Sequence, residues 1–222
     1  MSSTGVVAVW AAAFVSTHLA MSHPLRPAMV ARLGARRFTL VYSAVSLLTF
    51  VMMVQAYKAV PDQVSLWTAP PLVWIVGAVL MWLASVLLAG SLRKNPAMLG
   101  MTGGHEPVAI SAPSGVFRIT RHPMMWAFAL WAIVHIAVIA RPAGIVLAVA
   151  ILGLALLGAA GQDRKKASQL GAAWVDWQAA TSFIPFGRGL AIHDLFALAV
   201  GTVIFLLATW LHPVQVGVWQ WL

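Results

Sequence analysis

Long apolar segments alternate with short polar ones along almost the whole chain. Six of these segments contain no Asp, Glu, Lys or Arg: Val6–Met21, Phe38–Ala56, Leu66–Leu92, Pro123–Ala140, Ala143–Gly161 and Leu195–Leu211. About 20 apolar residues in a helix are enough to cross the hydrocarbon core of a membrane. The pattern therefore predicts an all-α, polytopic membrane helix bundle of about six transmembrane helices, formed by residues 1–222 as a single integral membrane domain.

Positive charge is distributed unevenly among the polar connectors. The connectors 22–37, 93–122 and 162–194 hold 12 of the 14 Lys and Arg residues, and the only other two are Lys58 and Arg141. Because cytoplasmic loops of membrane proteins are enriched in Lys and Arg, we expect these three connectors in the cytoplasm and both termini on the outer side. The long connector 93–122 has no further predicted role.

Composition agrees with a chain in contact with membrane lipids. Apolar residues make up 61% of the chain and charged residues 9%, and a mean hydropathy of +0.89 excludes a soluble globule. The net charge of +9 reflects membrane topology, so we expect no nucleic-acid partner. The chain has no cysteine, which excludes disulfides, thiolate metal sites and a cysteine nucleophile.

One cytoplasmic segment has the composition of a helix that lies on the membrane surface. Residues 164–180 combine Lys165 and Lys166 with Trp174 and Trp177. We expect an interfacial helix here, with the lysines toward lipid headgroups and the tryptophans toward acyl chains.

Two titratable side chains, His18 and His135, lie inside the predicted spans. An ionisable residue within a membrane is a candidate functional residue, although a histidine that only bonds a neighbouring helix remains an alternative. A helix rises about 1.5 Å per residue, so the two histidines differ in depth by about 12 Å, or less if the helices tilt. This geometry permits, without requiring, a haem iron held by both imidazoles.

Other residues could complete such a site. Met124, Phe128, Trp131 and His135 recur on one helical face, which is either a packing stripe or the wall of a flat apolar pocket. Arg118 and Arg121, next to His122, lie at the inner boundary, where they could pair with propionates or another anionic group. Only two candidate metal ligands are found, His18 and His135, which makes a zinc site less consistent with the sequence.

Three stretches of the sequence together resemble the NnrU family of bacterial membrane proteins. They are His18–Arg26 continuing through Gly34–Ser43, Arg118–Trp126 continuing to Trp131 and His135, and Thr181–Phe186. The resemblance implies a bacterial inner-membrane protein that is linked to denitrification through nitrite and nitric oxide reduction, and in that membrane the charge pattern predicts periplasmic termini. It does not supply a reaction.

The same pattern is similar to that of 15-cis-zeta-carotene isomerase. This likeness implies haem b held by histidines that correspond to His18 and His135, and an isomerase-like chemistry on an apolar, polyene-like ligand. A cysteine of the isomerase motif falls on Ala132 in this chain, which counts against the isomerase reaction itself.

A second likeness is to isoprenylcysteine and phospholipid methyltransferases. It rests on Arg121-His122-Pro123, on Leu170-Gly171-x-x-Trp174-x-x-Trp177 and on Ile184-Pro185. It implies binding of S-adenosylmethionine, but a glutamate pair of those enzymes is replaced here by Gln162-Asp163. A third hypothesis is a non-enzymatic assembly partner of a denitrification reductase, in which the histidines are structural.

Overall fold

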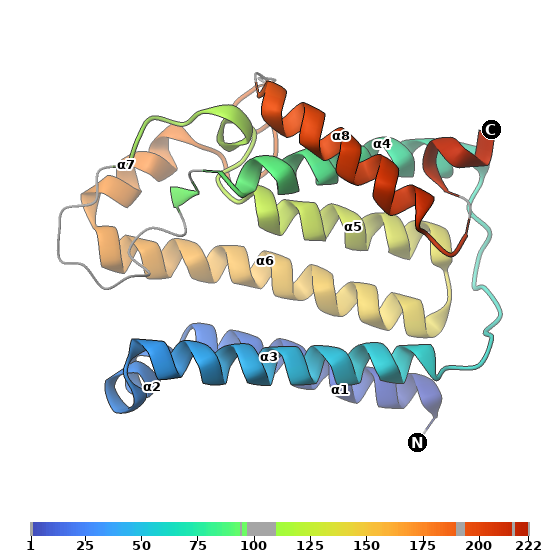
Figure 1. Cartoon of the computed structure of the whole chain (residues 1–222), viewed down its shortest axis with the longest axis horizontal. Coiled ribbons are helices and arrows are strands. Elements are labelled where there is room, and N and C mark those ends of the chain that lie inside the picture. The colour runs from blue at the N-terminus through green and yellow to red at the C-terminus, as the bar shows by residue number, and fades with distance from the viewer. Residues whose placement is uncertain (1, 94, 97–109, 190–193, 215, 222) are drawn as a thin grey trace. The chain divides into compact units, whose positions relative to one another are not determined.

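The structure is a computed structural model that describes all residues except 1, 94, 97–109, 190–193, 215 and 222 (Figure 1). Residues 94 and 97–109 of the predicted connector 93–122 therefore lie outside the described residues. The helices are α1 (Ser3–Ser22), α2 (Arg26–Leu33), α3 (Ala35–Lys58), α4 (Pro71–Ser91), η2 (Gly115–Arg118), α5 (Pro123–Ile139), α6 (Pro142–Leu170), α7 (Ala172–Ala180), α8 (Leu195–Trp210) and η3 (Gly217–Trp221).

Each of the six apolar segments forms a helix. Four helices, α1, α3, α4 and α6, are long and apolar enough to cross a membrane, whereas α5 and α8 are apolar helices of 17 and 16 residues. The segment predicted from Leu66 becomes helical only at Pro71, because Pro70 is extended and Pro71 begins the helix. Proline favours the first position of a helix, where its missing N–H leaves no hydrogen bond unmade.

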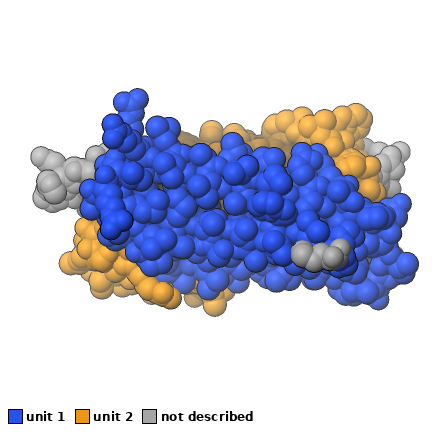
Figure 2. All heavy atoms as spheres, turned by 90° about the horizontal axis from the view of Figure 1, so that it is seen from below, with its two compact units in different colours: residues 1–69, 135–161 blue, residues 70–134, 162–222 orange. Residues whose placement is uncertain are grey.

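The described chain forms two compact units, each built from two separate stretches of sequence (Figure 2). Unit 1 comprises residues 1–69 and 135–161, and unit 2 comprises residues 70–134 and 162–222. The description of a single domain over residues 1–222 stays a prediction.

In unit 1, α3 packs along α1, and α2 joins the two helices at one end (Figure 1). The side chain of Gln63 donates a 2.8 Å hydrogen bond to the hydroxyl of Thr4 and accepts one of 2.9 Å from the backbone of Ala143. At the other end of these helices, a Cβ atom on Gly161 would lie 2.3 Å from the His23 imidazole. The starts of α1 and α6 thus lie close together, and the end of α1 lies against Gly161 in the second half of α6, so the two helices run parallel.

In unit 2, α4 and α8 approach each other closely along their length. A Cβ atom on Gly201 would lie 2.5 Å from the Cα atom of Val86, so only glycine allows this approach. The indole N–H of Trp82 also donates a 2.9 Å hydrogen bond to Thr202. The buried core of the unit adds residues from η2, α5 and α7 to those of α4 and α8: Val86, Leu87, Val116, Phe117, Ile119, Ala127, Leu130, Trp174, Trp177 and Ala197.

The prediction of one interfacial helix over residues 164–180 is wrong. Helix α6 continues to Leu170, and Gly171, with a φ of +55°, separates it from α7. Trp174 and Trp177 are 0% and 5% exposed and belong to the unit 2 core, so they do not face acyl chains. They are buried because the segment that contains Phe117 packs against them, an interaction that the local charge pattern does not encode.

Candidate functional site

The imidazole of His18 lies in a polar cluster within unit 1. Its Nε2 atom is 2.6 Å from the Tyr42 hydroxyl, and its Nδ1 atom is 3.3 Å from the Ser46 hydroxyl. Tyr42 and Ser46 lie one turn apart on α3, so both hydroxyls face the same neighbour. Phe14, one turn before His18 on α1, meets its ring edge-on at a centroid distance of 5.7 Å. We call His18, Tyr42 and Ser46 the His18 cluster.

The His18 cluster is satisfied as it stands, yet it is suited to a metal ligand. A hydroxyl can donate or accept, so either neutral tautomer of His18 has two partners. A histidine that binds a metal through one nitrogen commonly has its other nitrogen oriented by a hydrogen bond. The Ser46 hydroxyl is the hydrogen-bond partner of Nδ1. The Tyr42 hydroxyl is bonded to Nε2, the atom that would bind an iron.

An apolar groove of about 400 Å³ lies next to the cluster within unit 1. Four of its lining residues come from α1 and four from α6: Ala8, Ala11, Ala12, Val15, Ile145, Val146, Val149 and Ala150. The alanines leave space where larger side chains would fill the contact between the helices. Val15 precedes His18 by three residues, so the groove ends about one helical turn from the imidazole. The groove is shallow and open along one side, so it is a depression in the surface and not an enclosed pocket.

The second predicted ligand, His135, also belongs to unit 1. It lies in the last part of α5 and is partly buried. Two residues later, the carbonyl of Ala137 accepts a 2.9 Å hydrogen bond from the indole of Trp67. His135 thus approaches from the end of the unit where α6 begins, whereas His18 lies toward the end where α6 meets His23.

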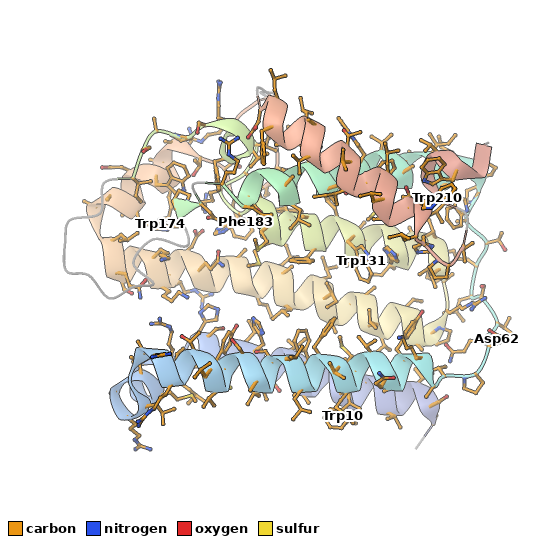
Figure 3. The ribbon with its side chains drawn as sticks, viewed as in Figure 1. Trp10, Asp62, Trp131, Trp174, Phe183 and Trp210 are labelled. Carbon is orange, nitrogen blue, oxygen red and sulfur yellow. The ribbon has the colours of Figure 1, made fainter. Side chains whose placement is uncertain are left out.

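The remaining predicted residues belong to unit 2. Phe128 is 45% exposed and Trp131 is partly buried on α5 (Figure 3). Arg118 ends η2 with an exposed side chain. Among the described residues, no group of three or more His, Cys, Asp or Glu side chains could hold a metal ion.

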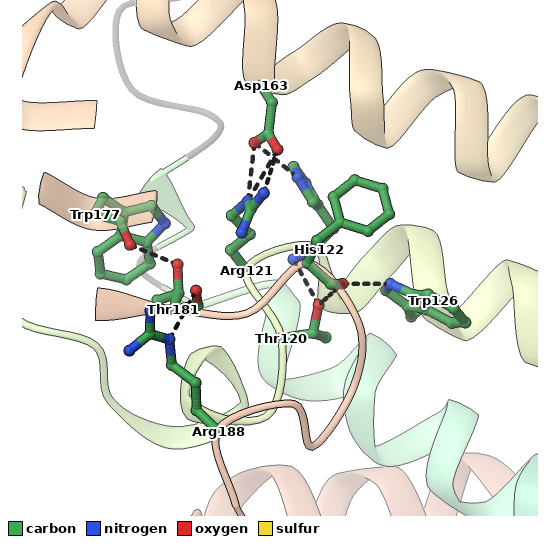
Figure 4. Close-up of polar contacts among 9 residues, drawn as sticks. Thr120, Arg121, His122, Trp126, Asp163, Trp177, Thr181 and Arg188 are labelled. Atoms are coloured by element: carbon green, nitrogen blue, oxygen red, sulfur yellow. Dashed lines mark hydrogen bonds and ion pairs between the residues drawn. The ribbon is translucent and has the colours of Figure 1, made fainter. Parts of the chain in front are cut away.

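Arg121 and His122 converge on Asp163 within unit 2 (Figure 4). The Arg121 guanidinium donates from Nε to both carboxylate oxygens, at 3.1 and 2.9 Å, and from Nη2 to Oδ2 at 2.7 Å. Nε2 of His122 lies 2.9 Å from Oδ1. The side chains of Arg121 and Asp163 are only 13% and 12% exposed, and that of His122 is fully buried. We call these three residues the Asp163 cluster.

A network of hydrogen bonds fixes the segment that carries Arg121 and His122. The Arg121 backbone donates to the carbonyl of Ser182 at 2.8 Å. The carbonyl of Phe183 accepts from the Thr120 hydroxyl at 2.8 Å and from the Trp126 indole at 2.7 Å. The Phe183 ring also packs edge-on against His122, with 5.2 Å between the ring centroids. These contacts leave the side chains of Arg121 and His122 little freedom to move away from Asp163.

The cluster orients His122 in a way that leaves one nitrogen available. Burial raises the pKa of Asp163, but hydrogen bonds and charge from His122 and Arg121 outweigh it and lower the pKa to about 2. Asp163 lies two residues beyond the charge-free segment 143–161 and stays ionised at neutral pH. Because a carboxylate only accepts, Nε2 of His122 carries a hydrogen. The Nδ1 atom of His122 is buried and has no hydrogen-bond partner among the described residues.

Comparison with known protein families identifies a match over nearly the whole chain. The profile of the NnrU family, described as NnrU protein, matches residues 6–220. The chain belongs to the NnrU family. No curated protein and no solved structure matches it. In this NnrU-family protein, the stretch that begins at His18 lies in unit 1. The stretches around Arg121 and Ser182 are neighbours in unit 2 through their backbone hydrogen bond.

Sequence reasoning missed two features of these sites. It found His18 but not its partners Tyr42 and Ser46, which are 24 and 28 residues away. It compared Asp163 with a cofactor-binding residue, whereas Asp163 pairs with Arg121 and His122. One signal was available: Asp163 is one of only five acidic residues, and it lies close to the end of an apolar helix, where an unpaired carboxylate would be costly.

Proposed function

We propose that this NnrU-family membrane protein binds haem b inside the membrane, with His18 as one iron ligand and His135 as the second. The observation that carries the proposal is the His18 cluster beside an apolar groove in the same unit. Ser46 orients the imidazole through Nδ1, and the groove of about 400 Å³ offers an apolar surface one turn away. Haem is a flat, largely apolar ligand, so this combination suits it.

The residues around His18 fit this role, with one exchange of partners. Binding iron through Nε2 of His18 requires the 2.6 Å hydrogen bond with Tyr42 to be given up. The hydroxyl is on a tyrosine side chain that is only partly buried, so it can turn away without emptying the core. Haem would supply electron transfer, or a reactive iron if only one histidine remained bound. The protein would hold the iron through His18, orient the imidazole through Ser46 and exclude water with the apolar helices.

The test is a titration of the detergent-purified protein with haem, followed by absorption spectroscopy. His18→Ala is expected to abolish the spectrum of iron bound to two histidines. His135→Ala is expected to leave haem on His18 alone, with the spectrum of five-coordinate iron. His212→Ala is the matched control, since His212 is exposed near the C-terminal end of the chain. Unchanged haem binding in both His18→Ala and His135→Ala would show that neither residue is a ligand.

We further propose that the haem protein serves nitrite and nitric oxide reduction, as membership of the NnrU family suggests. A deletion strain is expected to accumulate nitrite or nitric oxide under denitrifying growth, and the His18→Ala variant is expected not to restore reduction. Restoration by that variant, produced at normal levels, would instead favour the assembly role. In that role the protein stabilises a denitrification reductase, and it should co-purify with a subunit of that enzyme.

A second candidate function is methyl transfer from S-adenosylmethionine. The observation that favours it is that Arg121 and His122 contact Asp163. The methyltransferase hypothesis places the cofactor site at the two segments that contain these residues. Calorimetry of the folded, detergent-purified protein with S-adenosylmethionine decides between the two functions. Saturable binding that His122→Asn removes supports methyl transfer, and no heat of binding excludes it.

A further inference from the structure

An exposed group of arginines lies at the corner where α2 meets α3. Gly34 has a φ of +76°, which lets the chain turn sharply between the two helices. Arg32 precedes this turn and Arg36 and Arg37 follow it, and all three side chains are exposed. We call these three residues the arginine corner. Arg26, in contrast, is partly buried and lies over the Phe38 ring at 5.5 Å.

The arginine corner has no carboxylate within unit 1 to neutralise it. Residues 1–61 contain no Asp or Glu, and residues 135–161 contain none either, which leaves Asp62 as the one acidic residue of the unit. Asp62 lies 3.7 Å from Arg141, and it is next to Gln63, which contacts Thr4 at the start of α1. The single acid of unit 1 is therefore at the opposite end of α1 from the arginine corner.

The position of the corner indicates its partner. Helix α2 connects α1 and α3, both of which are long and apolar enough to cross a membrane (Figure 1). The link between two such helices lies at the level of the lipid headgroups. The exposed apolar side chains of Leu25 and Leu33, at the two ends of α2, are suited to the boundary with the acyl chains.

We propose that the arginine corner binds the phosphate groups of anionic phospholipids. Guanidinium groups pair with phosphate through two parallel hydrogen bonds. Three positive charges at one corner also favour an anionic headgroup over a zwitterionic one, whose choline cation offsets the phosphate charge. Each basic residue near an anionic membrane surface contributes about 1 kcal/mol, so the three together should favour phosphatidylglycerol over phosphatidylcholine by about a hundredfold. This inference does not depend on haem or on methyl transfer.

The experiment measures lipid binding to the full-length protein in detergent by native mass spectrometry. Phosphatidylglycerol and phosphatidylcholine of equal chain length are added separately, and their dissociation constants are compared. The triple variant Arg32→Gln, Arg36→Gln, Arg37→Gln is expected to lose at least tenfold of the preference for phosphatidylglycerol. The corresponding triple lysine variant keeps the charges but not the fork geometry, and it is expected to retain most of the preference.

A matched control removes cations from the other end of the same unit, through Lys58→Gln and Arg141→Gln. This variant is expected to keep the wild-type preference. Equal losses per cation removed in the control and in the glutamine variant would attribute the preference to net charge and overturn the proposal. An unchanged preference in a glutamine variant that elutes as the wild type would place the lipid site elsewhere. Competition by inorganic phosphate at the same concentration as the lipid would show recognition of free phosphate in place of a lipid headgroup.

Discussion

Replacing Asp163 by Asn tests the structure at its most concentrated set of polar contacts. The carboxylate accepts three hydrogen bonds from Arg121, at 3.1, 2.9 and 2.7 Å, and one from His122 at 2.9 Å. An asparagine of nearly the same shape keeps one accepting oxygen but removes the charge. Arg121 is then left mostly buried without a counter-charge.

The expected loss in the free energy of unfolding depends on how far the Arg121–Asp163 ion pair is exposed to water. Removing one partner of a fully buried ion pair costs about 3–5 kcal/mol, whereas exposed pairs contribute about 0–1 kcal/mol. Arg121 and Asp163 are 13% and 12% exposed, close to the buried limit but with some access to water. We therefore expect Asp163→Asn to lower the free energy of unfolding by about 2–3 kcal/mol.

The assay is unfolding of the purified protein in mixed micelles with increasing dodecyl sulfate, followed by the helical circular dichroism signal. Asp176→Asn is the matched control, because Asp176 is an exposed aspartate on α7, and surface changes usually stay within about 0.5 kcal/mol. The double variant with Arg121→Gln should cost less than the sum of the two single variants, since it removes the uncompensated charge. A loss for Asp163→Asn no larger than that of the control would refute the reasoning.

Three other predictions concern unit 1. Tyr42→Phe removes the hydroxyl that is hydrogen-bonded to Nε2 of His18. Because such a bond contributes about 1 kcal/mol, haem should bind about fivefold more tightly in a haem titration. Weaker binding would show that the Tyr42 hydroxyl contributes to haem binding. Gly161→Ala places a Cβ atom 2.3 Å from His23, whereas Gly153→Ala meets nothing within 4 Å. In unfolding assays Gly161→Ala should lower the free energy of unfolding by about 1–3 kcal/mol, and Gly153→Ala should raise it by about 0.5–1 kcal/mol. Equal effects of the two variants would contradict the close contact between Gly161 and His23. Because the chain has no cysteine, single cysteines test the topology: one before α1 should react with an impermeant reagent in spheroplasts, and one in the arginine corner should not.

The helices were predictable because each consists of a long run without charge, which is a local property of the sequence. Their ends were less predictable. The prediction placed the end of the fifth span at Gly161, where charge begins, but α6 continues to Leu170 and stops at Gly171. Charged residues can extend a helix into the headgroup region, whereas a glycine in the left-handed region ends it.

The residues of the candidate sites were likewise predictable where a local sequence feature marks them, and not where they depend on how the helices pack. A histidine inside an apolar run is unusual enough to be recognised from sequence, and this identified His18. Its pairing with Tyr42 depends on how α1 and α3 pack, and the pairing of Arg121 with Asp163 joins residues 42 positions apart. Arg118 and Arg121 were interpreted as topology signals and as partners of an anionic group. Neither interpretation could distinguish Arg121, which is held by Asp163, from Arg118, which is exposed.

The proposed haem site of the NnrU-family chain depends on His18 as an iron ligand. It is tested by the absorption spectrum of the detergent-purified protein, recorded as isolated and after reduction with dithionite, from cells supplied with a haem precursor. We expect a Soret band that sharpens and shifts on reduction and that is absent from His18→Ala. A spectrum without visible bands, or one that His18→Ala leaves unchanged, would contradict it.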